Sequence, residues 1–182
     1  MIRNKLLEFQ IALDCLLQAD LSISRKITAA TRNAYLQAQH QSPSYVQSPE
    51  FRLMFLRAES FDAPLAAHRM LVYLEEKLSR FGPGALTRSL TLQDLSPQAM
   101  AILLDSGIHQ LLPSRDSAGR AIYLVHSDGS VSDLIRQDPM ATTNVTFYLL
   151  SAAAEDEETQ KRGIVTLSTI AVLPKMEDMD VL

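Results

Sequence analysis

The stretch PSRDSAGRAIY, residues 113–123, holds the most suggestive group of reactive side chains in the sequence. Asp116, Gly119 and Arg120 stand together just before an apolar run. A glycine-containing loop of this kind cradles a phosphate when it leads into the N-terminus of a helix. Here it leads into AIYLV, whose β-branched and aromatic residues are typical of a strand. The sequence therefore favours a hairpin turn with a positive φ at Gly119 over a phosphate-binding loop.

A second candidate for catalysis is the run His126, Ser127 and Asp128, which offers a histidine, a hydroxyl and a carboxylate in succession. An α/β-hydrolase carries its nucleophile on a sharp strand-to-helix turn, and no such motif accompanies this run. A small hydrolase that uses His126 is therefore the weakest of the functional hypotheses. We expect a protein that is not an enzyme.

Metal binding and thiol chemistry have little support. The histidines lack the spacing of metal ligands, so we expect them on the solvated surface. They are His40, His68, His109 and His126. The single cysteine, Cys15, excludes an intrachain disulfide and a thiolate metal site. Its apolar helical surroundings predict a buried, inert thiol. We expect neither a metal nor a cofactor.

The composition, 47% hydrophobic and 21% charged over 182 residues, is that of one globular domain or of a small helical unit joined to a second core. The net charge of −4 argues against nucleic acid, because proteins that neutralise a phosphate backbone usually carry a basic excess. Glu8, Gln10 and Asp14 interrupt the N-terminal apolar residues, so neither a signal peptide nor a membrane span is expected there. Together with the single cysteine, this predicts a cytoplasmic protein.

The N-terminal half has the pattern of helices. Apolar residues recur at helical spacing in residues 3–39 and predict two helices, and residues 41–49 are expected to form a loop. The stripe of the second helix is Ile23, Ile27, Ala30 and Ala34. Helix starts are marked by a capping side chain close before a proline in the first turn. These pairs are Ser48-Pro49, Asp62 with Pro64, Ser96-Pro97 and Asp138-Pro139.

An amphipathic helix is predicted over residues 62–81, and GPG at 82–84 ends it. Its apolar stripe is Ala67, Leu71, Leu74, Leu78 and Phe81. A shorter helix follows over residues 96–105, and Gly107 stops it.

Beyond Gly107 the pattern changes to short apolar runs. Residues 108–113 and 121–126 read as strands, 138–160 as a helix, and 164–173 as a buried parallel strand. A strand, a helix and a strand in this order predict a right-handed βαβ crossover with parallel second and third strands. The predicted fold class is α/β, or α+β overall: an N-terminal helical bundle followed by a small mixed sheet.

Two pieces of the chain resemble the CRAL-TRIO family of lipid-carrying proteins. FLRAESFDAPLAAHRML, residues 55–71, is similar to the family's N-terminal helical module, in which FLRA, FD and a small-residue helix follow in that order. QLLPSRDSAGRAIYLV, residues 110–125, is similar to the start of the lipid domain: an edge strand, a D-x-x-G-R turn and a strand that bears an aromatic residue. In this sequence the turn runs from Asp116 to Arg120.

The resemblance implies a domain organisation. Residues 1–47 form an N-terminal helical extension, 48–95 the helical module, 96–173 the first part of the lipid domain, and 174–182 a tail. Family members continue past a strand such as IVTLSTIAVL with further βα units and a lid helix. The chain is therefore expected to carry a truncated lipid domain that lacks the second half of the pocket.

The function that this resemblance implies is non-enzymatic lipid binding or lipid transfer in the cytoplasm. The expected ligand is a hydrophobic small molecule or a phospholipid, with transient contact to a membrane surface and self-association as further expectations. The remaining pocket wall is expected from alternate strand residues and the covering helix. Its candidate residues are Tyr123, Val125, Phe147, Leu150, Val165 and Leu167. For each of them, ordinary core packing is the competing interpretation.

A second hypothesis belongs to another class of function. A sheet of about three strands leaves the strand at 164–173 with an exposed edge and an uncovered apolar face. The alternative is therefore a helical interaction or regulatory protein that associates with a partner through this unfinished edge.

Overall fold

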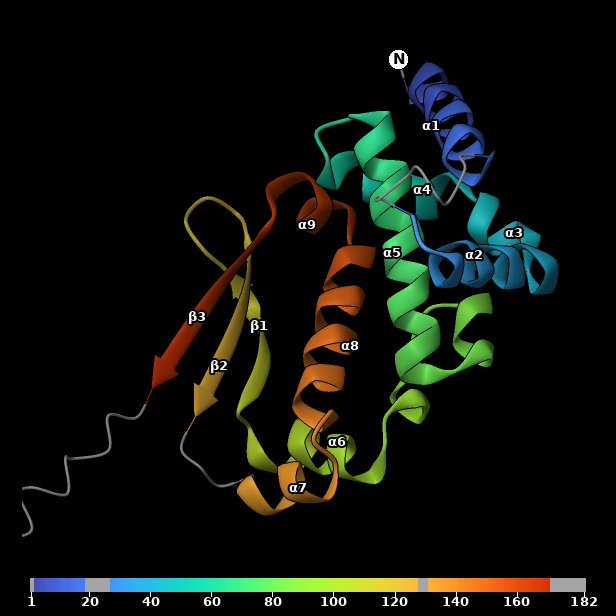
Figure 1. Ribbon diagram of the computed structural model, residues 1–182. Coiled ribbons are helices and arrows are strands. Elements are labelled where there is room, and N and C mark those ends of the chain that lie inside the picture. The colour runs from blue at the N-terminus through green and yellow to red at the C-terminus, as the bar shows by residue number, and fades with distance from the viewer. Residues whose placement is uncertain (1, 19–26, 128–130, 171–182) are drawn as a thin grey trace, which may run out of the picture. The chain divides into compact units, whose positions relative to one another are not determined.

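The computed structural model describes residues 2–18, 27–127 and 131–170 (Figure 1). Predictions for Ile23, Asp128 and residues 171–182 therefore lie outside the described residues. The chain divides into two compact units. We call Met1–Asp94 with Leu150–Lys161 the helical unit, and Leu95–Leu149 with Arg162–Leu182 the sheet unit.

The helical unit is built around one central helix, α5. Its elements are α1 (Ile2–Gln18), α2 (Ala29–Gln41), α3 (Pro43–Gln47), α4 (Pro49–Ala58), α5 (Ala63–Phe81), the short turns η1 (Pro83–Thr87) and η2 (Leu92–Asp94), and parts of α8 (Ala141–Glu155) and α9 (Glu157–Arg162). α5 packs against α1, α2 and α4. Ala67, Leu71 and Leu74 of α5 are buried, which confirms the predicted apolar stripe.

The core of this unit forms where the helices turn their apolar faces toward α5. α1 contributes Phe9 and Leu13, and α4 contributes Phe55 and Leu56, all of them buried. Full burial of a side chain of this size stabilises a fold by about 1.5–3 kcal/mol. The apolar face of α5 also buries Lys77, a position that the apolar stripe did not identify.

Helix capping in the structure agrees with the sequence at three of the four predicted starts. The side chains of Ser48, Asp62 and Ser96 each accept a hydrogen bond of 2.9–3.2 Å from the backbone N–H three residues later. The prediction for Asp138 is wrong, because Asp138 ends the preceding helix α7 (Ser132–Gln137) and α8 starts only at Ala141.

Two further helix predictions need correction. Residues 41–49 are not only a loop, since Pro43–Gln47 form α3, with Pro43 in its first turn. The single long helix predicted over 138–160 is in fact α8 followed by α9. Asp156 lies between them, and its carboxylate accepts a hydrogen bond of 2.8 Å from the backbone N–H of Thr159 in α9. A capping carboxylate of this kind starts a new helix.

The sheet unit contains a three-stranded mixed sheet, as predicted (Figure 1). Its elements are α6 (Pro97–Ala101), the π-turn η3 (Ile102–Ser106), β1 (His109–Arg115), β2 (Ala121–Ser127), α7, the start of α8, and β3 (Ile164–Ile170). The strand order is β1-β2-β3, with β1 antiparallel and β3 parallel to β2. The predicted fold class is confirmed.

The turn between β1 and β2 is the predicted hairpin. Gly119 has a φ of 76°, a conformation that glycine adopts without strain. The Asp116 carboxylate accepts hydrogen bonds from the backbone N–H groups of Ala118 and Arg120, at 3.0 and 2.8 Å. It also pairs with the Arg120 guanidinium at 2.7 Å. Asp116 and Arg120 thus hold the turn together.

The prediction that residues 164–173 form a buried strand is wrong for the part that the structure describes. Residues 166–169 of β3 are exposed, and 47% of the Leu167 surface is accessible to solvent. The reason is the position of the strand. Among the described residues, β3 is an edge strand that pairs only with β2.

Candidate functional site

The structure separates the residues of the predicted lipid pocket between the two faces of the sheet. In the parallel register of β2 and β3, Tyr123 lies opposite Thr166, and Val125 lies opposite Ser168. Directly paired residues share a face, and successive residues alternate between faces. Tyr123 and Val125 therefore share their face with two polar residues of β3.

Val165 and Leu167 lie on the other face of the sheet. They pair with Ile122 and Leu124 of β2. Leu167 is exposed, and the other three side chains of this group are half-buried. The four predicted strand residues therefore do not form one wall. The prediction needed Val165 and Leu167 on the same face as Tyr123 and Val125, and the register of β3 places them on the opposite face.

Tyr123 is held by hydrogen bonds on its own face of the sheet. Its hydroxyl lies 2.6 Å from Nδ1 of His109 and 2.9 Å from the hydroxyl of Thr146 in α8. The rings of His109 and Tyr123 stack with centroids 6.0 Å apart. Burial raises the pKa of Tyr123 and lowers that of His109. His109 is therefore a core residue and not the surface histidine that was predicted, and the polar group of Tyr123 is engaged within the protein.

The two helical candidates lie in different units. Phe147 and Leu150 are both half-buried residues of α8. Phe147 belongs to the sheet unit, whereas Leu150 is the first residue of α8 in the helical unit. The structure thus places Tyr123 and Val125 on one face of the sheet and Val165 and Leu167 on the other. Phe147 and Leu150 belong to different units.

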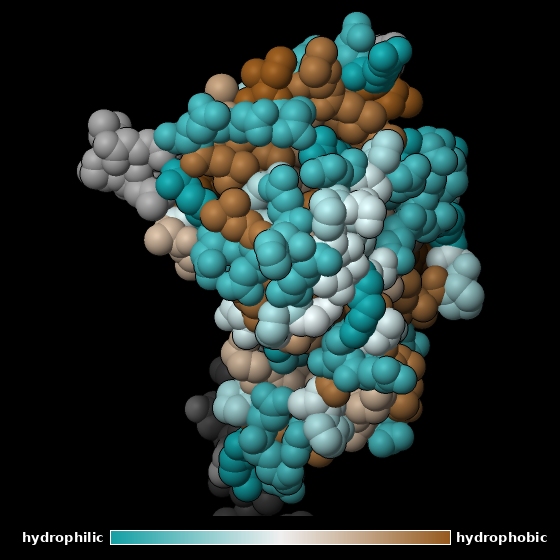
Figure 2. Space-filling model, turned by 90° about the vertical axis from the view of Figure 1, so that its right-hand side faces the viewer, coloured by the Kyte–Doolittle hydropathy of each residue, from teal (hydrophilic) through white to brown (hydrophobic). Residues whose placement is uncertain are grey.

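A groove that the sequence did not predict runs along α1 in the helical unit. It has a volume of about 830 Å³. It is lined by Lys5, Glu8, Ile11, Ala12, Cys15 and Leu16 of α1 and by residues 60–64. Ile11 is 56% exposed, and Cys15 is exposed, so the prediction of a buried thiol is wrong. In Figure 2, hydrophobic surface gathers at the top of the view, where α1 lies in Figure 1.

The far wall of this groove is the tight turn between α4 and α5. Ser60 and Phe61 have φ angles of 50° and 64°, a conformation that non-glycine residues rarely adopt. The Phe61 N–H donates a hydrogen bond of 2.6 Å to the Leu56 carbonyl, which closes the turn. The strained turn thereby holds Phe61 as a half-buried part of the groove wall.

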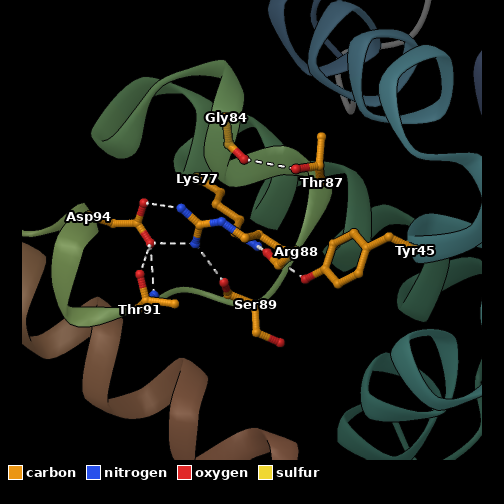
Figure 3. Close-up of polar contacts among 8 residues, drawn as sticks. All are labelled: Tyr45, Lys77, Gly84, Thr87, Arg88, Ser89, Thr91 and Asp94. Atoms are coloured by element: carbon orange, nitrogen blue, oxygen red, sulfur yellow. Dashed lines mark hydrogen bonds and ion pairs between the residues drawn. The ribbon is translucent and has the colours of Figure 1, made fainter.

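A buried lysine is the most perturbed cation in the described residues of the helical unit. Lys77 is fully buried, and its Nζ donates hydrogen bonds of 3.0 Å to the Tyr45 hydroxyl and 2.6 Å to the Arg88 carbonyl (Figure 3). The ammonium also lies 4.9 Å from the ring centroid of Tyr45 and 5.6 Å from that of Tyr73. Burial lowers the pKa of Lys77 to about 8. Lys77 lies three residues after Leu74, on the same helix face, and this spacing is the signal that could have revealed it.

The Arg88 carbonyl is fixed by a second polar cluster. The Arg88 guanidinium makes two hydrogen bonds to the Asp94 carboxylate, at 2.7 and 2.8 Å, and Asp94 also accepts from the backbone N–H of Thr91 at 2.7 Å (Figure 3). The hydrogen bonds from Arg88 are the main reason why the pKa of Asp94 falls to about 2. The segment that contacts Lys77 is therefore held in place by an ion pair.

A second, smaller cavity of about 250 Å³ lies in the helical unit, and we call it the aromatic pocket. It is lined by Tyr45, Ser48, Glu50, Phe51, Met54, Tyr73, Ser89, Ser151, Glu155 and Gln160. The rings of Tyr45 and Phe51 are 4.6 Å apart and those of Phe51 and Tyr73 are 6.1 Å apart, measured between centroids. The sequence did not predict this pocket, because its residues come from α3, α4, α5, α8, α9 and the loop at Ser89.

Metal chemistry and a membrane span find no support in residues 2–18, 27–127 and 131–170. No group of three or more histidine, cysteine or acidic side chains in these residues could hold a metal ion. None of their helices combines the length and the apolar character that crossing a bilayer requires.

The sequence matches no known family model, and no curated protein matches it.

Proposed function

We propose that this chain is a non-enzymatic binding protein for a hydrophobic, lipid-like molecule, and that the groove along α1 holds it. The observation that carries the proposal is the groove itself. Its volume of about 830 Å³ is within the range of ligand pockets, roughly 300–1,000 Å³. An exposed apolar groove on a protein is a common sign of a binding site.

The polar groups at the groove indicate which part of a ligand is recognised. The Lys5 ammonium pairs with the Glu8 carboxylate at 2.7 Å, and the Asp62 carboxylate caps α5 by accepting from the Leu65 N–H. These charges are engaged by the protein, and Ile11, Leu16 and other apolar side chains remain to meet the ligand. An acyl chain or another extended apolar group fits this surface better than a charged headgroup.

The resemblance to the CRAL-TRIO family supports the same class of ligand. The segment FLRAESFDAPLAAHRML supplies one wall of the groove, with Phe61, Ala63 and Pro64 among its lining residues. The hairpin DSAGR, the other part of the resemblance, lies in the sheet unit. The proposal thus places the ligand on the helical part of the resemblance and not on the sheet.

The proposal is tested by analysing what the purified chain binds. The protein is extracted with organic solvent, and the extract is examined by lipid mass spectrometry. The protein is then incubated with phosphatidylcholine vesicles that contain free fatty acid, re-isolated and extracted again. We expect bound lipid in at least one of the two extracts. Absence of lipid from both would contradict the proposal.

A second candidate function is self-association through the edge of the sheet. It is favoured by β3, which pairs only with β2 among the described residues and exposes Leu167. Unpaired strand edges of this kind add a strand from another chain. Light scattering on lipid-free protein tests it: a stable dimer that Leu167→Lys converts to monomer supports this function, and a monomer at all concentrations contradicts it.

A further inference from the structure

We propose that the aromatic pocket of the helical unit binds a small alkylated ammonium group, such as the trimethylammonium group of choline. This site is separate from the groove along α1, and its ligand differs in charge and size. The inference therefore stands independently of the proposed lipid ligand.

The shape of the pocket suits a compact group. Its volume of about 250 Å³ is below the usual range for drug-sized ligands, roughly 300–1,000 Å³. Tyr45, Phe51 and Tyr73 form a bent wall, with interplanar angles of 39° between the first two and 57° between the last two. Inclined aromatic faces can contact a rounded cation from more than one side, as in the aromatic cages that recognise quaternary ammonium groups.

The charges at the pocket favour a cation. Glu50 and Glu155 are exposed lining residues that bring two carboxylates to it. In the part of the chain that the structure describes, neither carboxylate has a hydrogen bond or an ion pair to a side chain. Burial raises the pKa of Tyr73, and the negative charge of Glu155 adds to this rise. An anionic ligand would be repelled by the same carboxylates.

The tyrosine rings already interact with a cation of the protein. The Lys77 ammonium is within 6 Å of the ring centroids of Tyr45 and Tyr73, at 4.9 and 5.6 Å, although Lys77 does not line the pocket. Its positive charge opposes a second cation, whereas the carboxylates of Glu50 and Glu155 at the pocket attract one. The pocket thus combines aromatic rings with two carboxylates, a combination that suits alkylated ammonium groups.

The hydrogen bonds of the pocket favour an ammonium that carries methyl groups over one that carries N–H donors. The Ser48 hydroxyl accepts from the Phe51 N–H at 3.2 Å and so caps α4. The Gln160 amide oxygen accepts a hydrogen bond from the Arg57 guanidinium. Apart from the Glu50 and Glu155 carboxylates, these lining acceptors are engaged within the protein, and the tyrosine rings offer contacts to methyl groups rather than acceptors for N–H groups.

Choline chloride is the probe that tests this inference. It is titrated into the full chain at constant ionic strength and followed by amide NMR shifts, beside the uncharged tert-butyl analogue of choline. We expect saturable shifts with choline and at least about threefold weaker binding of the analogue. The uncharged analogue lacks the cation–π interaction with the tyrosine rings and the attraction to the carboxylates. No saturable shift with choline, or equal affinity for the analogue, would overturn the inference.

Variants locate the site. Glu155→Gln should weaken choline binding about three- to tenfold, whereas Glu158→Gln, an exposed position nearby that does not line the pocket, should leave it unchanged. Tyr73→Leu should weaken binding by a similar factor, and Tyr73→Phe, which keeps the ring, should retain it. Circular dichroism checks the fold of each variant. Equal losses in Glu155→Gln and Glu158→Gln, or full affinity in a folded Tyr73→Leu, would overturn the inference.

Discussion

The ammonium of Lys77 donates a 3.0 Å hydrogen bond to the hydroxyl of Tyr45 in the interior of the helical unit. Burying a lysine ammonium costs free energy unless its N–H groups donate hydrogen bonds to acceptors of the protein. Here the Arg88 carbonyl accepts the second hydrogen bond of Lys77. Burial still disfavours the charged form, which is why the pKa of Lys77 is lowered from 10.5 to about 8.

The first prediction is that the free energy of unfolding increases between pH 8 and pH 10. In this window the folded chain has released the Lys77 proton, because its pKa is about 8, whereas the unfolded chain retains the proton up to its pKa of 10.5. By linkage, stability rises where the unfolded state binds more protons, here by roughly 2–3 kcal/mol. Above pH 10 the trend should reverse, because burial raises the pKa of Tyr45 and Tyr73 above the usual 10.0 and the folded chain then retains protons that the unfolded chain has lost.

Chemical denaturation at a series of pH values measures this dependence. Lys77→Met, which keeps the buried aliphatic chain, should remove the rise between pH 8 and pH 10. Lys5→Met, at a partly exposed site on α1, is the matched control and should retain it. An unchanged rise in Lys77→Met would show that another group causes it.

The second prediction concerns the hydrogen bonds of Tyr123. Tyr123→Phe leaves Nδ1 of the buried His109 and the hydroxyl of Thr146 without this partner, so it should lower the free energy of unfolding by about 1–3 kcal/mol. The control is Tyr148→Phe in α8, whose hydroxyl has no hydrogen bond within the described residues. Thermal denaturation compares the two, and equal stability of both variants would contradict the role assigned to Tyr123.

The third prediction separates backbone strain from crowding at the glycines. Gly119 and Gly82 both have a φ of 76°, but only at Gly119 would an added Cβ meet another side chain, the Arg162 Cδ, at 2.8 Å. Gly82→Ala should destabilise the chain by about 1 kcal/mol because of the backbone conformation alone. Gly119→Ala should cost at least as much as Gly82→Ala, because the same backbone strain is joined by the displacement of the Arg162 side chain. Gly84→Ala, with open space and no positive φ, should be close to neutral in urea denaturation.

The fourth prediction uses the single cysteine of the chain. Cys15 is exposed and lines the groove along α1, so a maleimide reagent should modify it at a measurable rate. If a lipid occupies the groove, it should shield the thiol and slow the reaction several-fold. The reaction is followed by mass spectrometry with and without added fatty acid. An unchanged rate at saturating fatty acid would place the ligand elsewhere.

The parts of the fold that depend on short-range patterns could be predicted from the sequence. Ser48, Asp62 and Ser96 cap helices because a capping side chain acts on a backbone N–H only three residues away. Asp138 misled the prediction because it is the C-cap residue of α7, where its backbone N–H donates to the Leu134 carbonyl. The β3 strand was predicted in type and pairing, but its exposure depends on which layers cover it, and local composition does not contain that information.

The candidate sites depend on long-range contacts and were mostly missed. Tyr123 and Val165 lie on opposite faces of the sheet because of the register between β2 and β3. A shift of one residue in this register would put them on the same face. Cys15 has the apolar neighbours of a core residue, yet it faces a groove that residues 60–64 complete. The aromatic pocket combines residues as distant as Tyr45 and Gln160, and no local signal connects them.

The most direct test of the proposed function is the affinity of a fluorescent fatty acyl probe for Ile11→Glu and Leu7→Glu. Both residues are exposed on α1, at 56% and 63%, but only Ile11 lines the groove, so neither change should disturb the fold. Leu167→Glu serves as the corresponding change on the sheet. We predict that Ile11→Glu weakens binding by about tenfold or more, because the ligand must then desolvate a carboxylate, and that the other two variants bind like the unmodified chain. Unchanged affinity in Ile11→Glu, or a loss confined to Leu167→Glu, would contradict the account.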